Sequence, residues 1–316
     1  MPTAIDLFCG CGGLSLGFQN AGFTILRAFD IWDKAINNYN LNFSHPAELQ
    51  DINQLSPDYL KSFSPDVIIG GPPCQDYSSA GKQDETLGRA NLTLRYAELV
   101  CSVRSRWFVM ENVDRILKSS TLPKALALFR NAGYGLSQVV LDASRCGVPQ
   151  KRKRFFLIGE LNGEDCALEF ALQNDQSTHC MTIRDYLQNE FGVEYYYRHP
   201  RSYARRGIFS IDEPSPTIRG VNRPLPQNYK VHPGDATQNL DGLRCLTTLE
   251  RARIQTFPAD FHFQGTKTDL EQMIGNAVPV DLASYVAKHL LSYMEHGASY
   301  TLSLIHISEP TRPLYI

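Results

Sequence analysis

The sequence predicts an α/β protein in which helices cover both faces of a parallel sheet, together with a second, smaller domain of irregular structure. Short apolar runs alternate with helix-like segments through the first half of the chain, and polar residues follow several of these runs. The alternation is lost between about residues 165 and 270. With 316 residues, the chain is long enough for one large α/β domain and a smaller one.

Strands and helices are expected in alternating order. Short apolar runs predict strands at residues 3–7, 24–29, 66–69, 107–110, 139–141 and 154–159. The segments between them, and one near the end of the chain, predict helices at residues 14–21, 34–42, 92–103, 121–132 and 280–293.

Four polar residues lie at or just past the ends of predicted strands. They are Asp6, Asp30, Cys74 and Glu111. In open parallel sheets, ligands bind at the carboxyl ends of the strands. We therefore expect these four residues to surround a ligand site.

The net charge of −2 does not by itself indicate a nucleic-acid partner, but the basic residues are clustered. Residues 150–154 read Gln-Lys-Arg-Lys-Arg, and six arginines crowd a segment that contains few acidic residues. These six are Arg198, Arg201, Arg205, Arg206, Arg219 and Arg223. Such clustering is typical of a surface that binds phosphates or base edges, and also of a solvated basic face.

The eight cysteines do not follow the spacing of a zinc site. Cys9 and Cys11 are close together, but no second pair of cysteines or histidines matches them. We expect reduced thiols, no metal, and a cytoplasmic protein with no signal peptide or membrane span.

The segment Gly70-Gly71-Pro72-Pro73-Cys74-Gln75 places a cysteine directly after two prolines, beyond an apolar run. The prolines stiffen the loop and remove two backbone donors. The thiol could therefore be a rigidly held nucleophile or a small packing residue in a tight turn. Glu111 leaves a similar choice, between a buried acid that donates a hydrogen bond and a salt-bridged carboxylate.

The glycine-rich turn at residues 10–13 follows a strand and precedes a helix. Its glycine spacing differs from the dinucleotide fingerprint, because Ser15 stands where the third glycine would be. An acid at the next strand end, Asp30, suits the hydroxyls of a ribose, and Trp32 could stack on an adenine. Asp51 and Ile52 could contact the same base, so the set favours a nucleoside cofactor.

Six motifs in one order identify a family resemblance. They are Phe8-x-Gly10-x-Gly12-Gly13, Pro72-Pro73-Cys74-Gln75, Glu111-Asn112-Val113, Gln150-x-Arg152-x-Arg154, the segment from Leu246-Thr247 through Gln255-Thr256-Phe257-Pro258, and Gly275-Asn276-Ala277-Val278-Pro279. Over residues 3 to 296 the chain closely resembles the DNA (cytosine-5) methyltransferases, above all those of bacterial restriction–modification systems. The resemblance implies a class I S-adenosylmethionine-dependent methyltransferase sheet, Rossmann-like, with a second, smaller target-recognition domain.

The resemblance also implies the chemistry. Cys74 would add to C6 of a cytosine that has been flipped out of duplex DNA, so that C5 can accept the methyl group of S-adenosyl-L-methionine. Glu111, in its protonated form, would contact the N3 and amine edge of the base. Arg154, with Arg152 nearby, would hold O2 or the adjacent phosphate.

The resemblance places further residues in the two binding sites. The cofactor pocket would contain Phe8, Gly10, Gly13, Asp30, Trp32, Asp51, Ile52, Pro73, Leu94, Asn276 and Val278. The DNA contacts would include Gln75, Ser78, Arg205, Arg206, Arg219 and Arg223. The chain departs from some relatives at Ile31, where they carry the ribose-binding acid, so that Asp30 must serve here.

The resemblance also suggests domain boundaries. Residues 1–178 with 272–301 would form the catalytic and cofactor-binding domain, and residues 179–271 the target-recognition domain. The recognition segment resembles enzymes that methylate sites beginning with GG, so a GG(N)CC-like site is expected, read by arginines in the major groove. The segment 302–316 resembles the translation of a sequencing-library adapter, and we expect the native chain to end before it.

Three alternative functions remain open at this level. The same scaffold could methylate cytosine in tRNA, or could be a catalytically idle DNA-binding protein. A nicotinamide dehydrogenase on a Rossmann fold fits less well, because of the glycine spacing and the Pro-Pro-Cys loop. For the methyltransferase we expect a monomer that acts on double-stranded DNA, with a cognate endonuclease as a further candidate partner.

Overall fold

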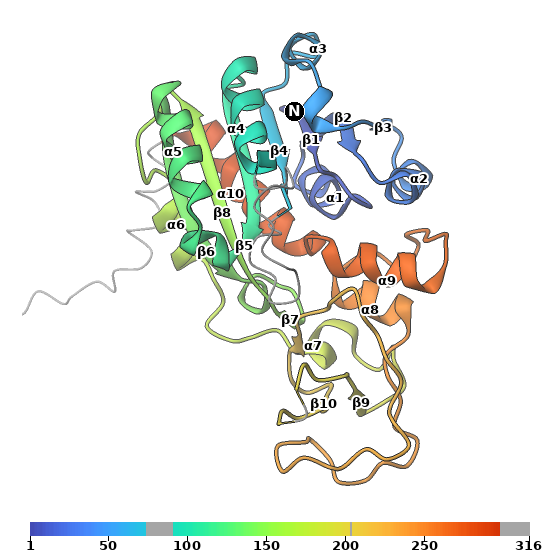
Figure 1. The fold of residues 1–316 in the computed structure, drawn as a ribbon. Helices are drawn as coiled ribbons and strands as arrows, with labels where there is room; N and C mark the ends of the chain where they lie inside the picture. Colours follow the sequence, from blue (N-terminus) through green and yellow to red (C-terminus); the bar gives the residue numbers. More distant parts are fainter. Residues whose placement is uncertain (74–90, 203, 298–316) are drawn as a thin grey trace, which may run out of the picture.

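A computed structural model describes residues 1–73, 91–202 and 204–297 of the chain. Its centre is a seven-stranded sheet with the strand order β3-β2-β1-β4-β5-β8-β6 (Figure 1). These strands are β1 (Thr3–Leu7), β2 (Thr24–Asp30), β3 (Ala47–Leu49), β4 (Val67–Gly70), β5 (Trp107–Val113), β6 (Tyr134–Asp142) and β8 (Lys153–Leu161). The expected α/β class is confirmed.

The sheet is not wholly parallel, in contrast to the prediction from the sequence. Strand β8 runs antiparallel to both of its neighbours, β5 and β6. A parallel arrangement of β6 and β8 would need a crossover connection of about a dozen or more residues. The connection at residues 143–152 contains only the short helix η3 (Ala143–Arg145) and the strand β7 (Gln150–Lys151). The chain therefore turns back directly, and β8 lies between β5 and β6.

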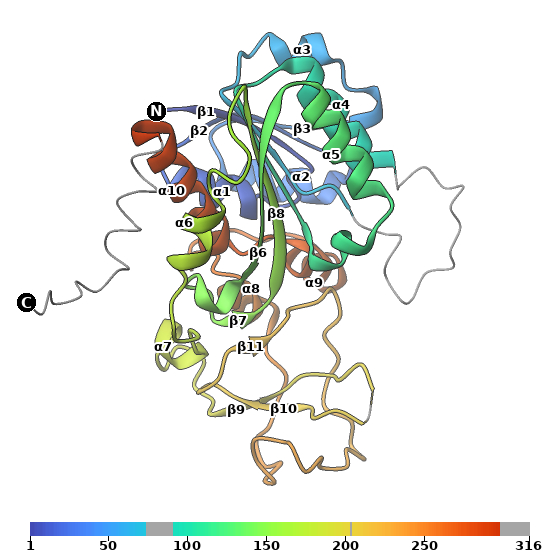
Figure 2. The same ribbon diagram turned by 90° about the vertical axis from the view of Figure 1, so that its left-hand side faces the viewer.

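Helices cover both faces of the sheet, as Figure 2 shows. On one face, α1 (Gly13–Asn20), α6 (Glu169–Asn174) and α10 (Val280–His296) bury one apolar cluster. On the other face, α3 (Pro57–Lys61), α4 (Asn91–Val103) and α5 (Thr121–Asn131) bury a second cluster. The helix α2 (Asp33–Asn42) covers the edge near β3, and η1 (Ile52–Gln54) and η2 (Asp114–Lys118) follow β3 and β5.

The helix α10 brings the end of the described chain back to the amino-terminal part. A Cβ atom added at Gly17 of α1 would lie only 2.4 Å from Cβ of Ala283 in α10. Glycine is therefore needed at this position for the two helices to approach so closely. Among the described residues, no helix is long and apolar enough to cross a membrane.

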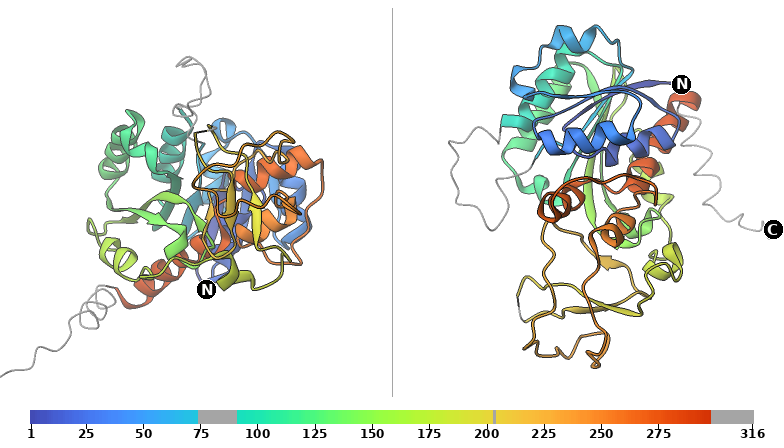
Figure 3. Two further views of the ribbon diagram at one scale, coloured as in Figure 1. Left: turned by 90° about the horizontal axis from the view of Figure 1, so that it is seen from below. Right: turned by 90° about the vertical axis from the view of Figure 1, so that its right-hand side faces the viewer.

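The segment between α6 and α8 contains little regular structure. It includes α7 (Ile183–Leu187), the antiparallel pair β9 (Tyr195–Tyr197) and β10 (Ile208–Ser210), and β11 (Ser215–Pro216), which pairs with β7. The helices α8 (Thr248–Ile254) and α9 (Lys267–Asn276) follow. In the right view of Figure 3 they lie between the blue amino-terminal part and the yellow segment below it. One apolar cluster joins all three, since it contains Ala35 of α2, Ile274 of α9 and Tyr196 of β9.

Candidate functional site

The predicted site residues lie where the order of the strands reverses. Strand β1 pairs with β2 on one side and with β4 on the other, and both pairs are parallel. Ligands of open α/β sheets bind in the crevice at such a switch point, outside the carboxyl ends of the strands. The glycine turn follows β1, Asp30 ends β2, and residues 71–73 follow β4. The structure therefore brings together three motifs that are far apart in the sequence.

The glycine turn is a tightly held backbone segment. Phe8, Gly10 and Gly12 have φ angles of 69°, 53° and 99°, which lie in the left-handed region that favours glycine. The N–H groups of Phe8 and Cys9 both donate to the carbonyl oxygen of Phe29 in β2. A Cβ atom at Gly10 would meet no atom within 4 Å, so the turn leaves open space on that side. This open space is where a ligand can approach the backbone.

Gly13 faces a different constraint from Gly10. A Cβ atom at Gly13 would lie 2.3 Å from the carbonyl oxygen of Val278. The start of α1 therefore packs directly on the Asn276–Val278 segment, of which Asn276 is exposed and Val278 is buried. Two of the predicted cofactor motifs, one from each end of the chain, are in contact.

Asp30 fixes the shape of the turn. Its Oδ2 accepts a hydrogen bond of 2.8 Å from the N–H of Gly10, and its Oδ1 accepts one of 2.9 Å from the N–H of Trp32. Burial raises the pKa of the Asp30 carboxyl, whereas the backbone hydrogen bonds lower it. Each oxygen keeps a further lone pair, so the carboxylate can also accept from a ligand hydroxyl.

The two residues after Asp30, Ile31 and Trp32, differ in their exposure. Trp32 packs against the apolar cluster of α8 and α9. Ile31 is 69% exposed and is the apolar side chain beside Asp30 that is free to contact a ligand. Ile31 is therefore exposed for contact with a base, and stacking of the partly buried Trp32 on a base stays a prediction.

The remaining predicted cofactor residues line the same region. Phe8, Ile52 and Leu94 belong to one apolar cluster. Asp51 precedes η1, and its Oδ1 accepts a hydrogen bond of 2.9 Å from the N–H of Asn53 within that helix. Pro73 is the last described residue before the gap. Cys74, Gln75 and Ser78 lie outside the described residues, as does the segment 302–316.

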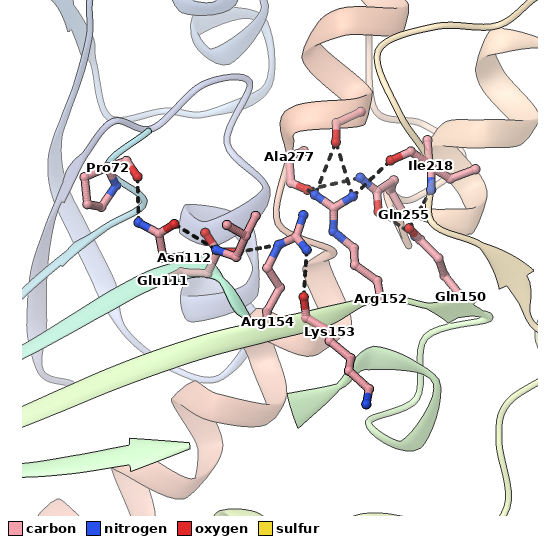
Figure 4. Close-up of polar contacts among 12 residues, drawn as sticks. Pro72, Glu111, Asn112, Gln150, Arg152, Lys153, Arg154, Ile218, Gln255 and Ala277 are labelled. Carbon is pink, nitrogen blue, oxygen red and sulfur yellow. Dashed lines mark hydrogen bonds and ion pairs between the residues drawn. The ribbon is translucent and has the colours of Figure 1, made fainter. Parts of the chain in front are cut away.

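Glu111 and Arg154 form a buried ion pair across two strands (Figure 4). The distance from Arg154 Nε to Glu111 Oε1 is 2.7 Å, and Glu111 is only 8% exposed. Glu111 lies within β5, two residues before its end, and not past the strand as predicted. Arg154 pairs in register with Val113, so its side chain shares a face with that of Glu111.

The second oxygen of Glu111 faces the loop that leads to Cys74. A Cβ atom on Gly71 would lie 3.2 Å from Glu111 Oε2, and Asn112 Nδ2 donates a 3.0 Å hydrogen bond to the carbonyl oxygen of Pro72 (Figure 4). Burial raises the pKa of Glu111, although the positive charges of Arg154 and Arg152 lower it. The carboxyl group therefore holds its proton to a higher pH than an exposed glutamate does.

Arg152 has a different environment from Arg154. It is 2% exposed, and its guanidinium donates to the carbonyl oxygens of Ile218, Gly275 and Ala277 at distances between 2.9 and 3.2 Å (Figure 4). These bonds hold the backbone on both sides of Asn276. The expected contact of Arg152 with a substrate base or phosphate is not compatible with this burial, so we assign it a positioning role.

Two glutamines complete the contacts around Arg152. Gln150 Nε2 donates a hydrogen bond of 2.7 Å to Gln255 Oε1. Gln150 Oε1 accepts one of 2.8 Å from the N–H of Ile218. Gln255 Nε2 donates to the carbonyl oxygens of Ile274 and Ala277. Both glutamines belong to motifs of the sequence, but the motifs alone predict no role for them. Their burial, which no sequence signal revealed, shows that they tie β7 to α8 and α9.

The predicted DNA-binding arginines fall into two groups. Arg205 and Arg223 are exposed. Arg206 makes two hydrogen bonds to Glu213, of 3.0 and 2.5 Å, and stacks 4.3 Å above the ring of Phe209. Arg219 is half-buried, and its guanidinium donates a 2.6 Å hydrogen bond to the carbonyl oxygen of His199. Arg206 and Arg219 are therefore partly committed within the protein, whereas Arg205 and Arg223 are available.

No group of three or more His, Cys, Asp or Glu side chains that could hold a metal ion occurs in the described part of the chain. The structure of a Dnmt2 methyltransferase from S. pombe matches with a TM-score of 0.70 and 21% sequence identity, over 93% of this chain and 99% of that chain. A methyltransferase from Entamoeba histolytica, EhMeth, matches with a TM-score of 0.68 and 17% identity, over 93% of this chain and 99% of that chain. These matches support the fold.

Comparisons of sequence identify the family. The family model of C-5 cytosine-specific DNA methylases matches residues 3–292. The Type II methyltransferase M.HindV of Haemophilus influenzae is 57% identical, over 92% of this chain and 96% of its own length. The Type II methyltransferase M.HgiDI of Herpetosiphon aurantiacus is 53% identical, over 95% and 98%. This family and this fold imply the use of S-adenosylmethionine. The chain therefore belongs to the C-5 cytosine-specific DNA methylases, as a DNA (cytosine-5) methyltransferase of the bacterial restriction–modification type.

Proposed function

We propose that the enzyme methylates C5 of a cytosine that is flipped out of a specific short site in duplex DNA, through a covalent bond between Cys74 and C6. The observation that supports this most strongly is the buried pair of Glu111 and Arg154, whose free carboxyl oxygen faces Gly71 in the loop that leads to Cys74. A flipped base is needed because C5 and C6 cannot be reached within a stacked duplex.

The proposed reaction begins when the Cys74 thiolate adds to C6 and breaks the C5–C6 double bond. The electrons shift toward N3, where the proton of Glu111 offsets the charge, and C5 becomes enamine-like. C5 then takes up the methyl group. Loss of the C5 proton to a base and departure of the Cys74 thiolate from C6 restore the double bond and release 5-methylcytosine.

Glu111 suits this role because burial favours its protonated form. Arg154 donates to one carboxyl oxygen and so leaves the other free for the base edge. We propose that Arg154 also holds O2 of the cytosine or the adjacent phosphate. For Arg152, the bonds to backbone carbonyl oxygens on both sides of Asn276 support a positioning role instead.

S-adenosylmethionine, when bound, supplies an electrophilic methyl group. We propose that it is held by the glycine turn and the residues around it, since Gly10 has open space on one side and Asp30 retains free lone pairs. The predicted set is kept, and Ile31 is added as an apolar side chain beside the adenine, because it is exposed, whereas Trp32 is partly buried. The set is Phe8, Gly10, Gly13, Asp30, Ile31, Trp32, Asp51, Ile52, Pro73, Leu94, Asn276 and Val278.

We propose that the segment 179–271 selects the DNA site, which we expect to resemble GG(N)CC. Arg223 is the strongest candidate for reading guanine. Its side chain is exposed and forms no hydrogen bond or ion pair with another described residue. Gln75 and Ser78 would contact the flipped nucleotide. One chain carries every proposed group, which supports action as a monomer.

The test is methylation of a mixed-sequence duplex by the purified protein with S-adenosylmethionine, followed by base-resolution sequencing of 5-methylcytosine. We expect marks at one short motif and none with Cys74→Ala, while Cys166→Ala, which changes an exposed cysteine, leaves the pattern unchanged. Marks that persist with Cys74→Ala would remove Cys74 as the nucleophile. Methylation of tRNA but not of the duplex would replace the DNA substrate in the proposal.

A further inference from the structure

A basic hollow lies in the recognition segment, away from the catalytic residues. It has a volume of about 320 Å³. One wall comes from the β9–β10 connection, with Pro200 and Arg205, and the other from residues 226–232. Arg205, Lys230 and His232 contribute basic groups, and Asn228 a polar amide, whereas none of the described lining residues is acidic. The hollow therefore has the charge of an anion-binding site.

One carboxylate joins the two walls. Asp235 Oδ1 accepts hydrogen bonds of 2.8 and 2.9 Å from the N–H groups of Gly207 and Ile208, just after the first wall. Its Oδ2 accepts a 2.7 Å bond from the N–H of His232 and a 2.8 Å bond from the hydroxyl of Tyr229, in the second wall. Asp235 thus accepts four hydrogen bonds that hold the two walls together. Because these bonds form within the protein, the hollow is preformed.

The donors of the hollow are available to a ligand. The Nδ1 atom of His232 accepts a 2.9 Å hydrogen bond from the N–H of Gly234, so the ring proton is on Nε2, which can donate. Arg205 and Lys230 are exposed. The next residue along the chain, Arg206, is paired with Glu213, so that carboxylate does not neutralise Arg205.

We propose that this hollow binds a phosphodiester group of the substrate DNA, held by Arg205, Lys230 and His232. The shape argues for phosphate and against a base edge. The major groove is concave, so a side chain that reads bases must protrude into it, whereas a hollow can receive a protruding phosphate. In Figure 2 the β9–β10 connection lies on the same side of the molecule as η2, which follows the catalytic strand β5.

The proposal gives Arg205 one of the two roles that the sequence leaves open for the clustered arginines, namely contact with a phosphate and not with a base edge. A phosphate contact fixes the position of the protein on the duplex and carries no sequence information. The proposal of a phosphate-binding hollow rests on the proposed function in one respect only, namely that the segment 179–271 binds the duplex substrate.

The test measures the dissociation constant of the full chain for two duplexes, one with and one without the methylated motif, over a range of salt concentrations. The variant is Arg205→Ala/Lys230→Ala. We expect weaker binding of both duplexes by a similar factor, and a slope of log affinity against log salt that is less steep by about 1 to 2. The methylated motif remains the same.

A matched control removes two exposed cations outside the segment 179–271. Lys61→Ala/Arg130→Ala changes the net charge equally, at the ends of α3 and α5, and should leave the slope unchanged. Arg205→Lys should retain most of the slope. Urea unfolding of each variant checks that the fold is intact.

Two results would overturn the proposal while the wild-type enzyme still methylates its motif. One is an unchanged salt slope in the folded double variant. The other is a relaxed motif, which would make Arg205 or Lys230 a base reader. If the wild-type enzyme methylates no duplex at all, the proposed function fails, and the salt slope still reports whether the hollow binds nucleic-acid phosphate.

Discussion

The catalytic region and the recognition segment are built in different ways. At the carboxyl ends of the sheet, strand register and tight glycine turns place the functional groups, as with Arg154, which lies diagonally opposite Glu111 across β5 and β8. In the recognition segment, side chains bound to backbone groups hold loops in place, as Asp235 does. Chemistry that needs fixed geometry can thus be placed on strands, whereas the DNA reading that we propose for the segment 179–271 would use loops that can vary.

A second contrast lies between two arginines that are two residues apart. Arg154 forms an ion pair with Glu111, whereas Arg152 is buried among carbonyl oxygens from the Ile218 and Asn276 regions. The motif Gln-x-Arg-x-Arg therefore contributes to both regions. One arginine is the partner of the proposed catalytic glutamate, and the other holds the backbone near Ile218 against the backbone near Asn276.

The largest effect in this comparison is expected for Glu111→Gln. The amide retains the size of the side chain but cannot supply an acidic proton to N3, so kcat should fall by roughly 10²- to 10³-fold. Binding of DNA should change little, because the pair is not part of the recognition segment. Single-turnover methylation and a DNA-binding titration measure the two effects. An unchanged kcat would remove Glu111 from the chemistry, and Glu295→Gln, on the exposed face of α10, is the control.

Arg152→Ala should act on stability first. The change removes the Arg152 donor from three carbonyl oxygens, of which, among the described residues, only that of Ala277 keeps another side-chain donor, Gln255 Nε2. We expect a loss of about 3 kcal/mol or more in the free energy of unfolding. Arg152→Lys should not restore it, since a single ammonium group cannot reproduce the planar fork of donors. Urea unfolding measures the loss. A variant of wild-type stability with reduced activity would instead support direct contact with the substrate.

The pH dependence of stability should show the burial of Asp6. Desolvation raises the pKa of this carboxyl to about 8, and Ser15 Oγ donates a 2.5 Å hydrogen bond to it. Between about pH 4 and pH 8 the Asp6 carboxyl therefore holds a proton in the folded state and has lost it in the unfolded state. The contribution of Asp6 to stability is greatest below the unfolded pKa and falls as the pH rises through 8. In Asp6→Asn this fall of several kcal/mol should disappear from the unfolding curves.

Arg154→Ala should move a pH limb of the reaction. The positive charge of Arg154 lowers the pKa of Glu111, although burial raises it more. Without Arg154 the carboxyl should keep its proton to higher pH, so the alkaline fall in kcat that reflects Glu111 should shift upward. The measurement is kcat against pH for both proteins. A limb that stays in place would mean that Glu111 does not set it.

The smallest effects should separate the arginines of the recognition segment. Arg223→Ala should reduce discrimination at one base pair by about 1–3 kcal/mol, because its exposed guanidinium has the freedom to reach a guanine. Arg206→Ala should change site choice by less than about 1 kcal/mol, since that guanidinium is paired with Glu213. Base-resolution sequencing of the methylated motif compares the two variants. A reversed order would exchange their roles.

Much of the catalytic region could be predicted from the sequence because it depends on local patterns. Alternating apolar runs located β1, β2, β4, α1, α2, α4, α5 and α10 to within a few residues. The reversed direction of β8 depends on the short connection that precedes it, and its strand pattern looks the same in either direction. The apolar run ends at Met110, so Glu111 was predicted just past the end of a strand. In the structure β5 continues through Glu111 to Val113.

The recognition segment and the roles of individual side chains were harder to predict. The strands β9, β10 and β11 are only two or three residues long, too short for a periodic signal. The burial of Arg152 and the difference in exposure between Ile31 and Trp32 depend on tertiary packing. For the same reason, arginines that look alike in sequence divide into free and paired groups only when the contacts of Glu213 and His199 are known.

The most direct test of the account is to trap the enzyme on a duplex that contains 5-fluorocytosine at the methylated position, in the presence of S-adenosylmethionine. Fluorine cannot leave C5 as a cation, so elimination is blocked and the adduct should persist. We predict a covalent complex whose modified peptide, identified by mass spectrometry, carries the base on Cys74, and no complex with Cys74→Ala. A folded enzyme that methylates the normal duplex but forms no adduct, or an adduct on another residue, would contradict the account.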